Sequence, residues 1–435
     1  MNRVINGAAR DKSLVVLGGG FGGVTATKRL ERTLPPDWQI TLLSLNNYIT
    51  YQPLLPEVVG ASVLPGHVVA PLRQIVRRAR VCMVTVTGID TEARQISYLG
   101  EGSGIVGYDH LIIACGVEAN LRLVEGMASY SLPLKTLGDA LFLRNRIVVR
   151  LEQAELQPND ELRRWLTSFV VVGGGFSGVE TAGELIDFIY ASLRYYPRIH
   201  RDDIRITLLH SSDRLLPELS PGLGQIALKK MQSRGLEARL NARAVRVDDR
   251  AVYLDNGAVI QAGTVICTIG TIASSLVQDL PVATQRGRLV TNADLSVAGL
   301  EHVWAIGDCA LVPNAYDDKP CPPTAQFAER QARTLARNIV AKTRGRATTA
   351  FSYRPMGQLA SIGHNNAVAE ILGIRVSGFI AWLMWRGLFL LRIPTLGRKV
   401  RLYLEWNWAM FFPPDTTHFS FARTKRKPKV VVNRE

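Results

Sequence analysis

Two glycine clusters in this 435-residue chain have the same spacing, and that spacing is typical of a turn that binds a dinucleotide. In a strand followed by G-x-G-x-x-G and a helix, the first glycine makes a tight turn and the second lets the backbone approach a pyrophosphate. The third glycine lets the helix pack on the strand. The two clusters are Gly18, Gly20 and Gly23, and Gly173, Gly175 and Gly178. One copy alone is weak evidence, but two copies in matched context predict two dinucleotide-binding sites.

The elements that must position these glycines are repeated as well. An apolar run precedes each cluster, and helical patterns follow at Val24–Leu30 and Val179–Tyr190. A second apolar run comes after each helix, at Gln39–Leu45 and Ile204–His210. Strand, turn, helix and strand therefore occur twice, which predicts an α/β protein with two Rossmann-like units of parallel strands.

Later apolar runs close the two units. Asp109–Gly116 follows the first unit and Thr264–Gly270 follows the second, with Gly270 a candidate cofactor-binding residue at its end. His302–Asp308 is predicted to return to the first sheet, so that the second unit is inserted into the first. Alternating segments at Gly88–Gly107 and Arg243–Ala262 are typical of strand meanders.

Composition excludes several classes of protein. Hydrophobic residues make up 47% of the chain and charged residues 20%, which excludes overall disorder. The net charge of +15 favours contact with anionic lipid or phosphorylated ligands, but no recognisable nucleic-acid module is present. Five Cys without a CxxC pair exclude a disulfide framework, and the seven His lack metal-ligand spacing, so no metal site is expected. Met1–Ser13 lacks the apolar core of a secretory signal.

Several segments together carry a resemblance to a known family. They are the two glycine units, Asn47-Tyr48 with Tyr51–Leu55, Ala305–Asp308 (AIGD), Pro322–Gln326 (PPTAQ) and the amphipathic tail Gly378–Phe412. Over residues 13 to 412 the sequence resembles the two-dinucleotide-fold flavoprotein reductases. Within them it is most similar to the type II, non-proton-pumping NADH:quinone dehydrogenases.

The resemblance implies three parts and a reaction. Residues 1–130 and 285–375 would form a discontinuous FAD-binding domain, 131–284 an inserted NAD(P)H-binding domain, and 376–435 a membrane-associating helical segment with a basic tail. The protein would pass a hydride from NAD(P)H to FAD and electrons to a quinone, as a peripheral protein at the cytoplasmic face of the cell membrane. Alternatives are a soluble NAD(P)H diaphorase, a reductase of another acceptor, and a flavin-binding redox sensor. A homodimer is also left open.

The resemblance also implies site residues. Asp308 would bond the ribityl chain of FAD, Gln52 would lie near the flavin, and Glu180 would be the acid close to the flavin and nicotinamide rings. Ala325 and Gln326 would lie on the quinone side, beneath the flavin. Plainer roles stay open for each: a turn or capping Asp, an ordinary loop, a helix-surface Glu, and a capped helix start.

Three residues depart from the family pattern. Ser44 ends the second strand of the first unit, where an acidic residue usually bonds the adenosine ribose. His210 stands where the family usually has Glu, which puts the preference for NADH over NADPH in doubt. Both remain candidate cofactor ligands. Arg330 replaces the second Gln of A-Q-x-A-x-Q, so a quinone pocket of altered polarity is expected.

Cysteine placement argues against a disulfide mechanism. Reductases that pass electrons through a disulfide need two thiols at the flavin. Cys115 and Cys267 stand in apolar runs, which favours a place in the core. Cys309 and Cys321 are the pair that could approach each other.

The tail after Arg375 differs in composition from the rest of the chain. It holds Trp382, Trp385, Trp406 and Trp408, and its end, Arg423–Lys429, is strongly basic. Val376–Ile393 is apolar but is broken by Arg386 and Arg392, and it falls short of a membrane span. In Leu396–Phe412 the apolar face is predicted to be Val400, Tyr403, Leu404, Trp408 and Phe411, opposite Arg398, Arg401 and Glu405. Such helices favour the interface of an anionic membrane, and the alternative is a dimer-forming or core-capping hairpin.

Overall fold

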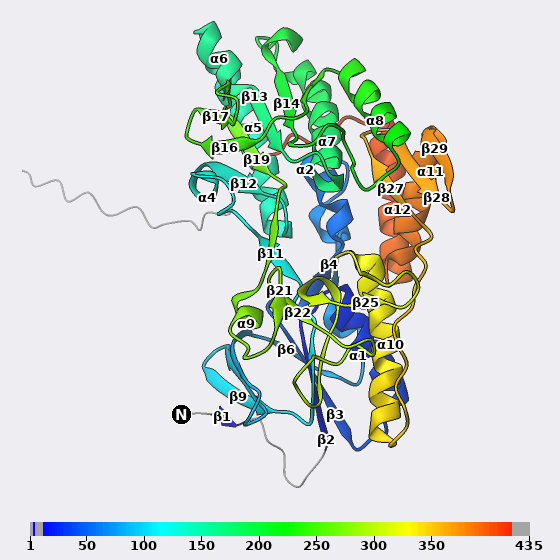
Figure 1. Ribbon diagram of the computed structural model, residues 1–435. Helices are drawn as coiled ribbons and strands as arrows, with labels where there is room; N and C mark the ends of the chain where they lie inside the picture. Colours follow the sequence, from blue (N-terminus) through cyan, green and yellow to red (C-terminus); the bar gives the residue numbers. More distant parts are fainter. Residues whose placement is uncertain (1–2, 5–11, 420–435) are drawn as a thin grey trace, which may run out of the picture.

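Two parallel five-stranded sheets form the two lobes of the molecule (Figure 1). This computed structural model describes residues 3–4 and 12–419. The lower sheet has the order β23 (Val303–Ala305), β10 (His110–Ile113), β2 (Lys12–Leu17), β3 (Trp38–Ser44) and β6 (Arg80–Met83). The upper sheet has the order β12 (Ser131–Pro133), β19 (Thr264–Cys267), β13 (Ser168–Val172), β14 (Arg205–Leu209) and β15 (Leu236–Arg239). Apolar runs form these strands because both faces of a parallel sheet are covered.

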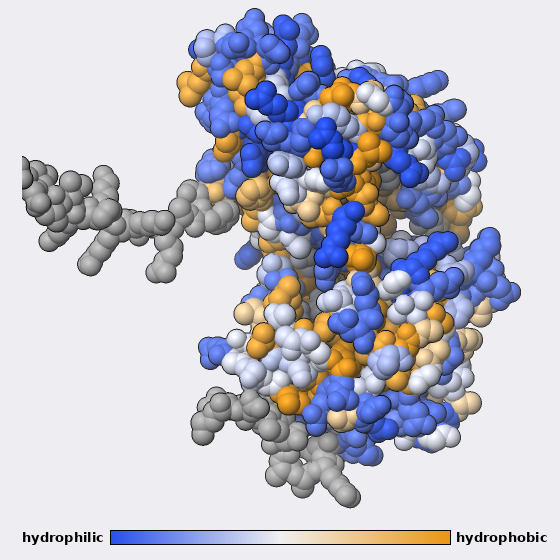
Figure 2. All heavy atoms as spheres, turned by 60° about the vertical axis from the view of Figure 1, so that its left-hand side comes forward, coloured by the Kyte–Doolittle hydropathy of each residue, from blue (hydrophilic) through white to orange (hydrophobic). Residues whose placement is uncertain are grey.

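The return of the chain to the first sheet is confirmed. Strand β23 pairs in parallel with β10, Leu111 opposite Val303 and Ile113 opposite Ala305. The whole upper sheet therefore lies in sequence between strands of the lower sheet. Antiparallel pairing of β11 (Val117–Ala119) with β20 (Thr271–Ala273) joins the two lobes. Figure 2 shows hydrophobic residues gathered along the hollowed waist between them.

The two predicted meanders are also confirmed. Strands β7 (Thr85–Asp90), β8 (Gln95–Leu99) and β9 (Ser103–Gly107) form one, to which β1 (Arg3–Val4) adds. Strands β16 (Ala244–Val247), β17 (Ala251–Leu254) and β18 (Val259–Gln261) form the other. Shorter strands complete the lower lobe: β4 (Tyr48–Thr50), β5 (Val69–Pro71), β21 (Thr284–Gln285), β22 (Arg288–Val290), β24 (Ala310–Leu311), β25 (Pro313–Asn314) and β26 (Lys319–Pro320).

The helices after the glycine turns begin earlier than predicted. Helix α1 (Phe21–Thr33) and helix α7 (Phe176–Ser192) start directly after Gly20 and Gly175, because these glycines are the N-caps. The Thr324 hydroxyl caps helix α10 (Ala325–Thr343) by accepting from the Phe327 amide. The other helices before the tail are α2 (Leu55–Val59), α3 (Leu72–Ile75), α4 (Met127–Tyr130), α5 (Leu137–Leu156), α6 (Asp160–Leu166), α8 (Pro221–Ser233) and α9 (Ser275–Gln278).

The C-terminal part is a small sheet with two helices. Strands β27 (Gly357–Ser361), β28 (Ala367–Ile371) and β29 (Ile374–Gly378) pair with one another in antiparallel fashion, and α11 (Phe379–Arg392) and α12 (Leu396–Phe411) follow. We therefore propose that this part begins near residue 356 rather than 376. None of the helices in residues 12–419 is long and apolar enough to cross a membrane. The basic stretch Arg423–Lys429 lies outside the described residues.

Candidate functional site

A cavity of about 420 Å³ and one of about 620 Å³ mark the lower lobe. The larger one lies at the carboxyl ends of the lower sheet's parallel strands, where ligands of such folds bind. It brings together six of the residues singled out from the sequence: Gly18, Gly20, Ser44, Gln52, Asp308 and Ala325. The cavity is also lined by Ser274, Ser275 and Asp279 at α9. We therefore propose that the lower-lobe domain resumes near residue 271, earlier than the boundary predicted at 285.

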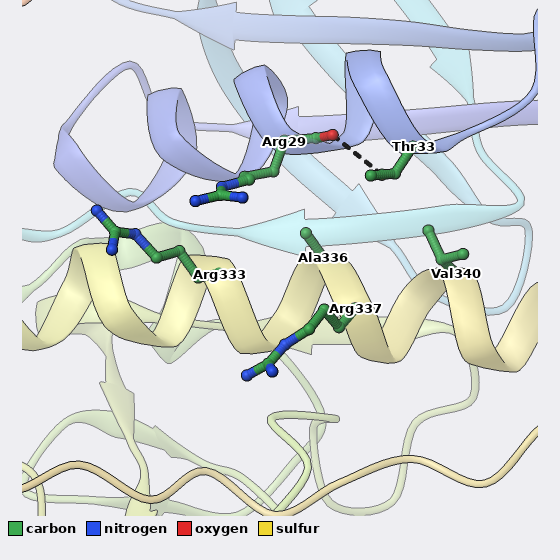
Figure 3. Close-up of a pocket in the computed structure, with 6 residues that line it drawn as sticks. All are labelled: Arg29, Thr33, Arg333, Ala336, Arg337 and Val340. Atoms are coloured by element: carbon green, nitrogen blue, oxygen red, sulfur yellow. Dashed lines mark hydrogen bonds between the residues drawn. The ribbon is translucent and has the colours of Figure 1, made fainter.

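The smaller cavity is a groove between α1 and α10 (Figure 3). Arg29 and Thr33 line it from α1, and Arg333, Ala336, Arg337 and Val340 line it from α10. Its lining includes no carboxylate, thiol or glycine turn. We therefore place the candidate site in the larger cavity.

The first glycine turn has the geometry that the pattern requires. Gly18 has a φ of +111°, and a Cβ there would overlap the carbonyl oxygen of Ala114. A Cβ on Gly23 would overlap the carbonyl oxygen of Gly18, so the helix can pack this closely only because the residue is glycine. At Gly20 a Cβ would meet nothing within 4 Å, which leaves the backbone open to a ligand. This cradle at a helix N-terminus fits the pyrophosphate of a dinucleotide.

Asp308 lines the same cavity, next to a turn that another helix holds. Gly307, with a φ of +75°, donates its amide to Oε1 of Gln331 on α10 at 2.7 Å. Burial raises the pKa of Asp308, and the charges of Lys135 and Arg288 lower it. The sequence did not identify Gln331 as a site residue. Its only sequence signal was that it follows Arg330, the residue that departs from the family's A-Q-x-A-x-Q pattern. Its buried side chain fixes the backbone that presents Asp308.

Ser44 and Gln52 both lie at the cavity wall. Ser44 ends β3 and is buried, and a Cβ on Gly19 would overlap its hydroxyl. The hydroxyl therefore lies directly against the glycine turn. Gln52 donates from Nε2 to the carbonyl oxygen of Lys135 at 3.3 Å, which ties the loop before α2 to the segment before α5.

The second glycine turn repeats the first, with a different residue at the strand end. Gly173 has a φ of +123°, and a Cβ on Gly178 would overlap its carbonyl oxygen. The Gly174 amide donates to Nδ1 of His210 at 3.1 Å. Since Nδ1 accepts, the proton of the neutral ring is on Nε2, which is buried and has no partner in the described residues. Burial lowers the pKa of His210, which favours that neutral form.

Gly270 has no free space around its Cα for a side chain. Its φ is +66°, and a Cβ there would overlap the side chain of Leu123. Its carbonyl oxygen accepts from the Asn120 amide at 3.2 Å, close to the strand pair that joins the lobes. A ligand role for Gly270 stays a prediction.

Glu180 is not a surface residue, so its plainer interpretation is wrong. It is 7% exposed on α7, two residues after Gly178. Its Oε1 accepts from the Ser361 amide at 3.1 Å and from Nε1 of Trp385 at 3.3 Å. Burial raises the pKa of Glu180 to about 8, although these two hydrogen bonds lower it. A carboxyl of this kind can hold or release a proton near neutral pH.

Gln326 and Arg330 meet at a tyrosine that the sequence did not indicate. Gln326 donates from Nε2 to the hydroxyl of Tyr353 at 2.9 Å, and the Arg330 guanidinium lies over the ring of Tyr353 at 5.2 Å. Ala325, one residue earlier, lines the larger cavity, whereas Gln326 is not among its lining residues. The departure at Arg330 is therefore accommodated by a cation–π contact.

The five thiols are all free, and the thiol that lies beside Cys309 is Cys115, while an approach of Cys309 to Cys321 stays a prediction. Cys309 is buried and hydrogen-bonds Cys115, a pairing that lowers the pKa of Cys309 and raises that of Cys115. Sequence separation hid this contact, because it forms only when β23 pairs with β10. In the described residues, no group of three or more His, Cys, Asp and Glu could hold a metal ion.

Comparison with known proteins agrees with this geometry. Residues 12–332 match the family described as pyridine nucleotide-disulphide oxidoreductase, and residues 356–413 match the NDH2 C-terminal domain. A type II NADH:quinone oxidoreductase of Mycobacterium tuberculosis is 32% identical over 92% of this chain and 88% of its own length. A Staphylococcus aureus relative with the same name is 28% identical over 84% of this chain and 91% of its own length.

Solved structures show the same fold. NDH2 from Plasmodium falciparum, in complex with NADH, has a TM-score of 0.87 at 19% identity, over 94% of this chain and 100% of its own. A sulfide:quinone oxidoreductase from Aquifex aeolicus has a TM-score of 0.68 at 18% identity, over 91% and 92% of the two chains. The predicted α/β fold with two dinucleotide-binding units and C-terminal helices is confirmed. This chain belongs to the pyridine nucleotide-disulphide oxidoreductase family and, within it, to the type II NADH:quinone oxidoreductases.

Proposed function

We propose that this chain binds FAD in the larger cavity, oxidises NADH at the second glycine turn and reduces a membrane quinone. The observation that supports this proposal most is the glycine turn, which occurs twice in one chain with the same backbone geometry. FAD, when bound, supplies the hydride-accepting and electron-passing chemistry that side chains lack. The residues of this chain would bind and orient the two dinucleotides and move a proton.

Each predicted site residue has a proposed role. Asp308 would accept from the ribityl hydroxyls, and Gly20 would leave room for the FAD pyrophosphate. His210, whose ring is held against the second glycine turn by the Gly174 amide, would lie at the ribose of the nicotinamide dinucleotide. Glu180 would hold a proton beside the reacting rings. Because His210 is neutral rather than acidic, it would repel a 2′-phosphate less than Glu does, so we expect a shallow preference for NADH.

The orientation of α12 supports attachment to a membrane surface. Two of its polar residues face the protein: Glu405 accepts from the Leu64 amide at 2.6 Å and pairs with His67, and Arg398 donates to the Gly66 carbonyl at 2.7 Å. Arg401, predicted to lie on the same face, is exposed instead. The α12 apolar residues Val400, Tyr403, Leu404, Trp408 and Phe411 are 48–79% exposed, as the sequence predicted for one shared face. An outward apolar face flanked by Arg suits the interface of an anionic membrane.

The tail also caps the core, so membrane attachment and a core-capping hairpin do not exclude each other. Trp382, Trp385 and Trp406 are buried, and Trp408 is the exposed one of the four. Three of the tail tryptophans therefore stabilise the fold rather than anchor it in lipid. Attachment at the cytoplasmic face is part of the proposal, and a homodimer stays a prediction.

The test is a purified-protein assay. We expect flavin absorbance, identified as FAD after release, and steady oxidation of NADH with a soluble quinone well above the rate with oxygen alone. Assays that cross NADH and NADPH with several quinones give the cofactor preference. Flavin reduction without turnover would favour the redox-sensor alternative, and turnover with dyes but no quinone would favour a diaphorase with an altered acceptor pocket at Arg330.

Membrane attachment needs surface variants rather than truncation, because Trp385 contacts Glu180. Leu404→Glu and Phe411→Glu should reduce sedimentation with anionic vesicles, and salt should weaken the wild-type attachment. Leu156→Glu on α5 is the matched control, since Leu156 is 77% exposed outside the tail. Unchanged sedimentation of the tail variants would contradict this part of the proposal.

A further inference from the structure

Three buried carboxyl groups lie where the two lobes and the C-terminal helices pack together. Glu57 on α2 is 4% exposed, Glu180 on α7 is 7% exposed and Glu184 on α7 is 6% exposed. Glu57 accepts from Nε1 of Trp406 at 2.8 Å, and Glu184 accepts from the hydroxyl of Ser62 at 2.8 Å.

The acids on α7 form a row that leads outward. Glu180, Glu184 and Asp187 have the spacing i, i+4 and i+7, so they share one face of the helix. At a rise of ~1.5 Å per residue the row spans about 10 Å. Its inner end is two residues from Gly178. At its outer end the Asp187 side chain is 31% exposed and pairs with Arg234.

Charge balance requires this cluster to hold protons. Burial raises the pKa of Glu57 to about 7 and that of Glu184 well above its usual range, with Glu57 and Asp187 adding repulsion at Glu184. The Arg386 guanidinium on α11 lowers both values but is itself buried, and its Nε has no hydrogen-bond partner in the described residues. One cation cannot neutralise three buried carboxylates, so at least one carboxyl is protonated at neutral pH.

Other charged groups face the cluster from the surrounding elements. Glu405 on α12 adds repulsion at Glu57 and is paired with His67. Asp187 accepts from the amide of His364, whose ring lies against Trp382 and whose pKa is lowered by burial. The outer end of the row is therefore polar and held in place, and the middle is poor in positive charge.

The proposed reaction consumes a proton that the chain must deliver. Oxidation of NADH by a quinone follows NADH + H⁺ + Q → NAD⁺ + QH₂, so one proton per turnover comes from solution. We propose that Glu184, with Glu57 beside it, relays this proton from Asp187 at the surface to Glu180 at the rings. This inference rests on the proposed function.

The transfer needs no further reactant. Glu180 gives its proton to the quinone as it is reduced, Glu184 in its acid form reprotonates the Glu180 carboxylate, and Glu184 is reprotonated from water at Asp187. Charge and atoms therefore balance after each turnover. Glu180 and Glu184 are four residues apart on the same face of α7, so their side chains are neighbours on the helix.

The experiment compares two electron acceptors on the holoenzyme. Ferricyanide takes electrons without protons, whereas a soluble quinone takes both. Glu184→Gln keeps the size of the side chain and an acceptor for Ser62, and should slow quinone reduction at least about tenfold more than ferricyanide reduction at pH 8. The loss should shrink in acid, and small weak acids in the buffer should restore part of the rate. Glu184→Asp should retain most of the quinone rate.

Two further measurements separate a relay from a structural role. The infrared difference spectrum between the NADH-reduced and oxidised holoenzyme should contain a protonated-carboxyl band that Glu184→Gln loses. Asp187→Asn, at the surface end, should show the same split between acceptors, whereas Glu161→Gln on the exposed face of α6 should show none. Loss of both activities with loss of flavin would assign Glu184 a structural role and overturn the relay.

Failure of the relay and failure of the proposed function look different. If wild-type protein reduces quinone and Glu184→Gln matches its rates, pH profile and infrared spectrum, the relay is wrong and the function stands. If wild-type protein reduces ferricyanide but no quinone, the function is wrong. In that case the infrared spectrum still decides about Glu184. If the protonated-carboxyl band is unchanged in Glu184→Gln, the relay is wrong too. If the band is lost, Glu184 remains the proton donor, but to another acceptor.

Discussion

The two glycine turns have the same backbone but different neighbours. Gly18 and Gly173 share a positive φ, and at both turns the third glycine packs against the carbonyl oxygen of the first. At the strand ends they diverge, because the small hydroxyl of Ser44 lies against the first turn and the ring of His210 lies against the second. We therefore expect the glycines to let a pyrophosphate approach at both turns, and the strand-end residue to determine how the ribose is recognised.

The largest effect should come from adding a Cβ at the third glycine of either turn. In Gly23→Ala and Gly178→Ala the methyl group would overlap a carbonyl oxygen, so α1 or α7 must move away from its strand. Gly23→Ala should lose more than about 90% of its bound flavin, while Gly178→Ala should keep flavin but need at least about tenfold more NADH. Flavin absorbance and KM measure the two outcomes.

Gly102→Ala is the control for these variants, because a Cβ there meets nothing within 4 Å. If Gly178→Ala loses flavin and Gly23→Ala keeps it, the two turns are assigned to the wrong dinucleotides.

Asp308→Ala should weaken flavin binding by about 1.5–3 kcal/mol, the cost of losing a hydrogen bond to a charged group. Titration of the apoprotein with FAD measures the dissociation constant. Asp317→Ala, in the exposed turn after β25, is the comparison variant. An unchanged constant in Asp308→Ala would support the turn-forming role instead.

Replacing His210 with Glu should shift the ratio of kcat/KM toward NADH over NADPH by about 1–3 kcal/mol. Burial lowers the pKa of His210 below 6.5, so the wild-type ring is neutral above that pH and gains a charge only in more acid solution. The wild-type KM for NADH should therefore show no titration of His210 above pH 6.5, and a change near pH 8 would belong to Glu180, whose pKa is about 8. A ratio that does not move in His210→Glu places this residue away from the ribose.

The smallest effect is expected at Ser44, where one neutral hydrogen bond is involved. Ser44→Ala should weaken FAD binding by about 1 kcal/mol, and Ser44→Asp should restore or exceed the wild-type affinity. Isothermal titration of the apoprotein measures both. An equal loss in the two variants would mean that the hydroxyl packs against Gly19 without touching the ligand.

Local sequence was enough for the parts of the site that follow from chain neighbours. A strand, a glycine turn and a helix are adjacent in sequence, so their geometry is set by backbone sterics and appears twice in readable form. The place of Asp308 followed for the same reason, since Gly307 and Asp308 follow β23 after a single residue, Ile306. The starts of α1 at Phe21 and of α7 at Phe176 were missed because the predicted helical patterns began only after the third glycine of each turn.

Sequence alone determined that this protein is an α/β chain with two dinucleotide turns and an amphipathic C-terminal helix, because periodicity and glycine spacing are local properties. Only the tertiary structure decided which side chains became buried. It placed Trp385 on Glu180, Cys115 beside Cys309, and Glu57 near Glu184, pairs that are far apart in the chain. It also turned Glu405 and Arg398 of α12 inward, onto His67 and the backbone of Gly66. Burial and charge coupling depend on which elements pack together, and no pattern within one element contains that information.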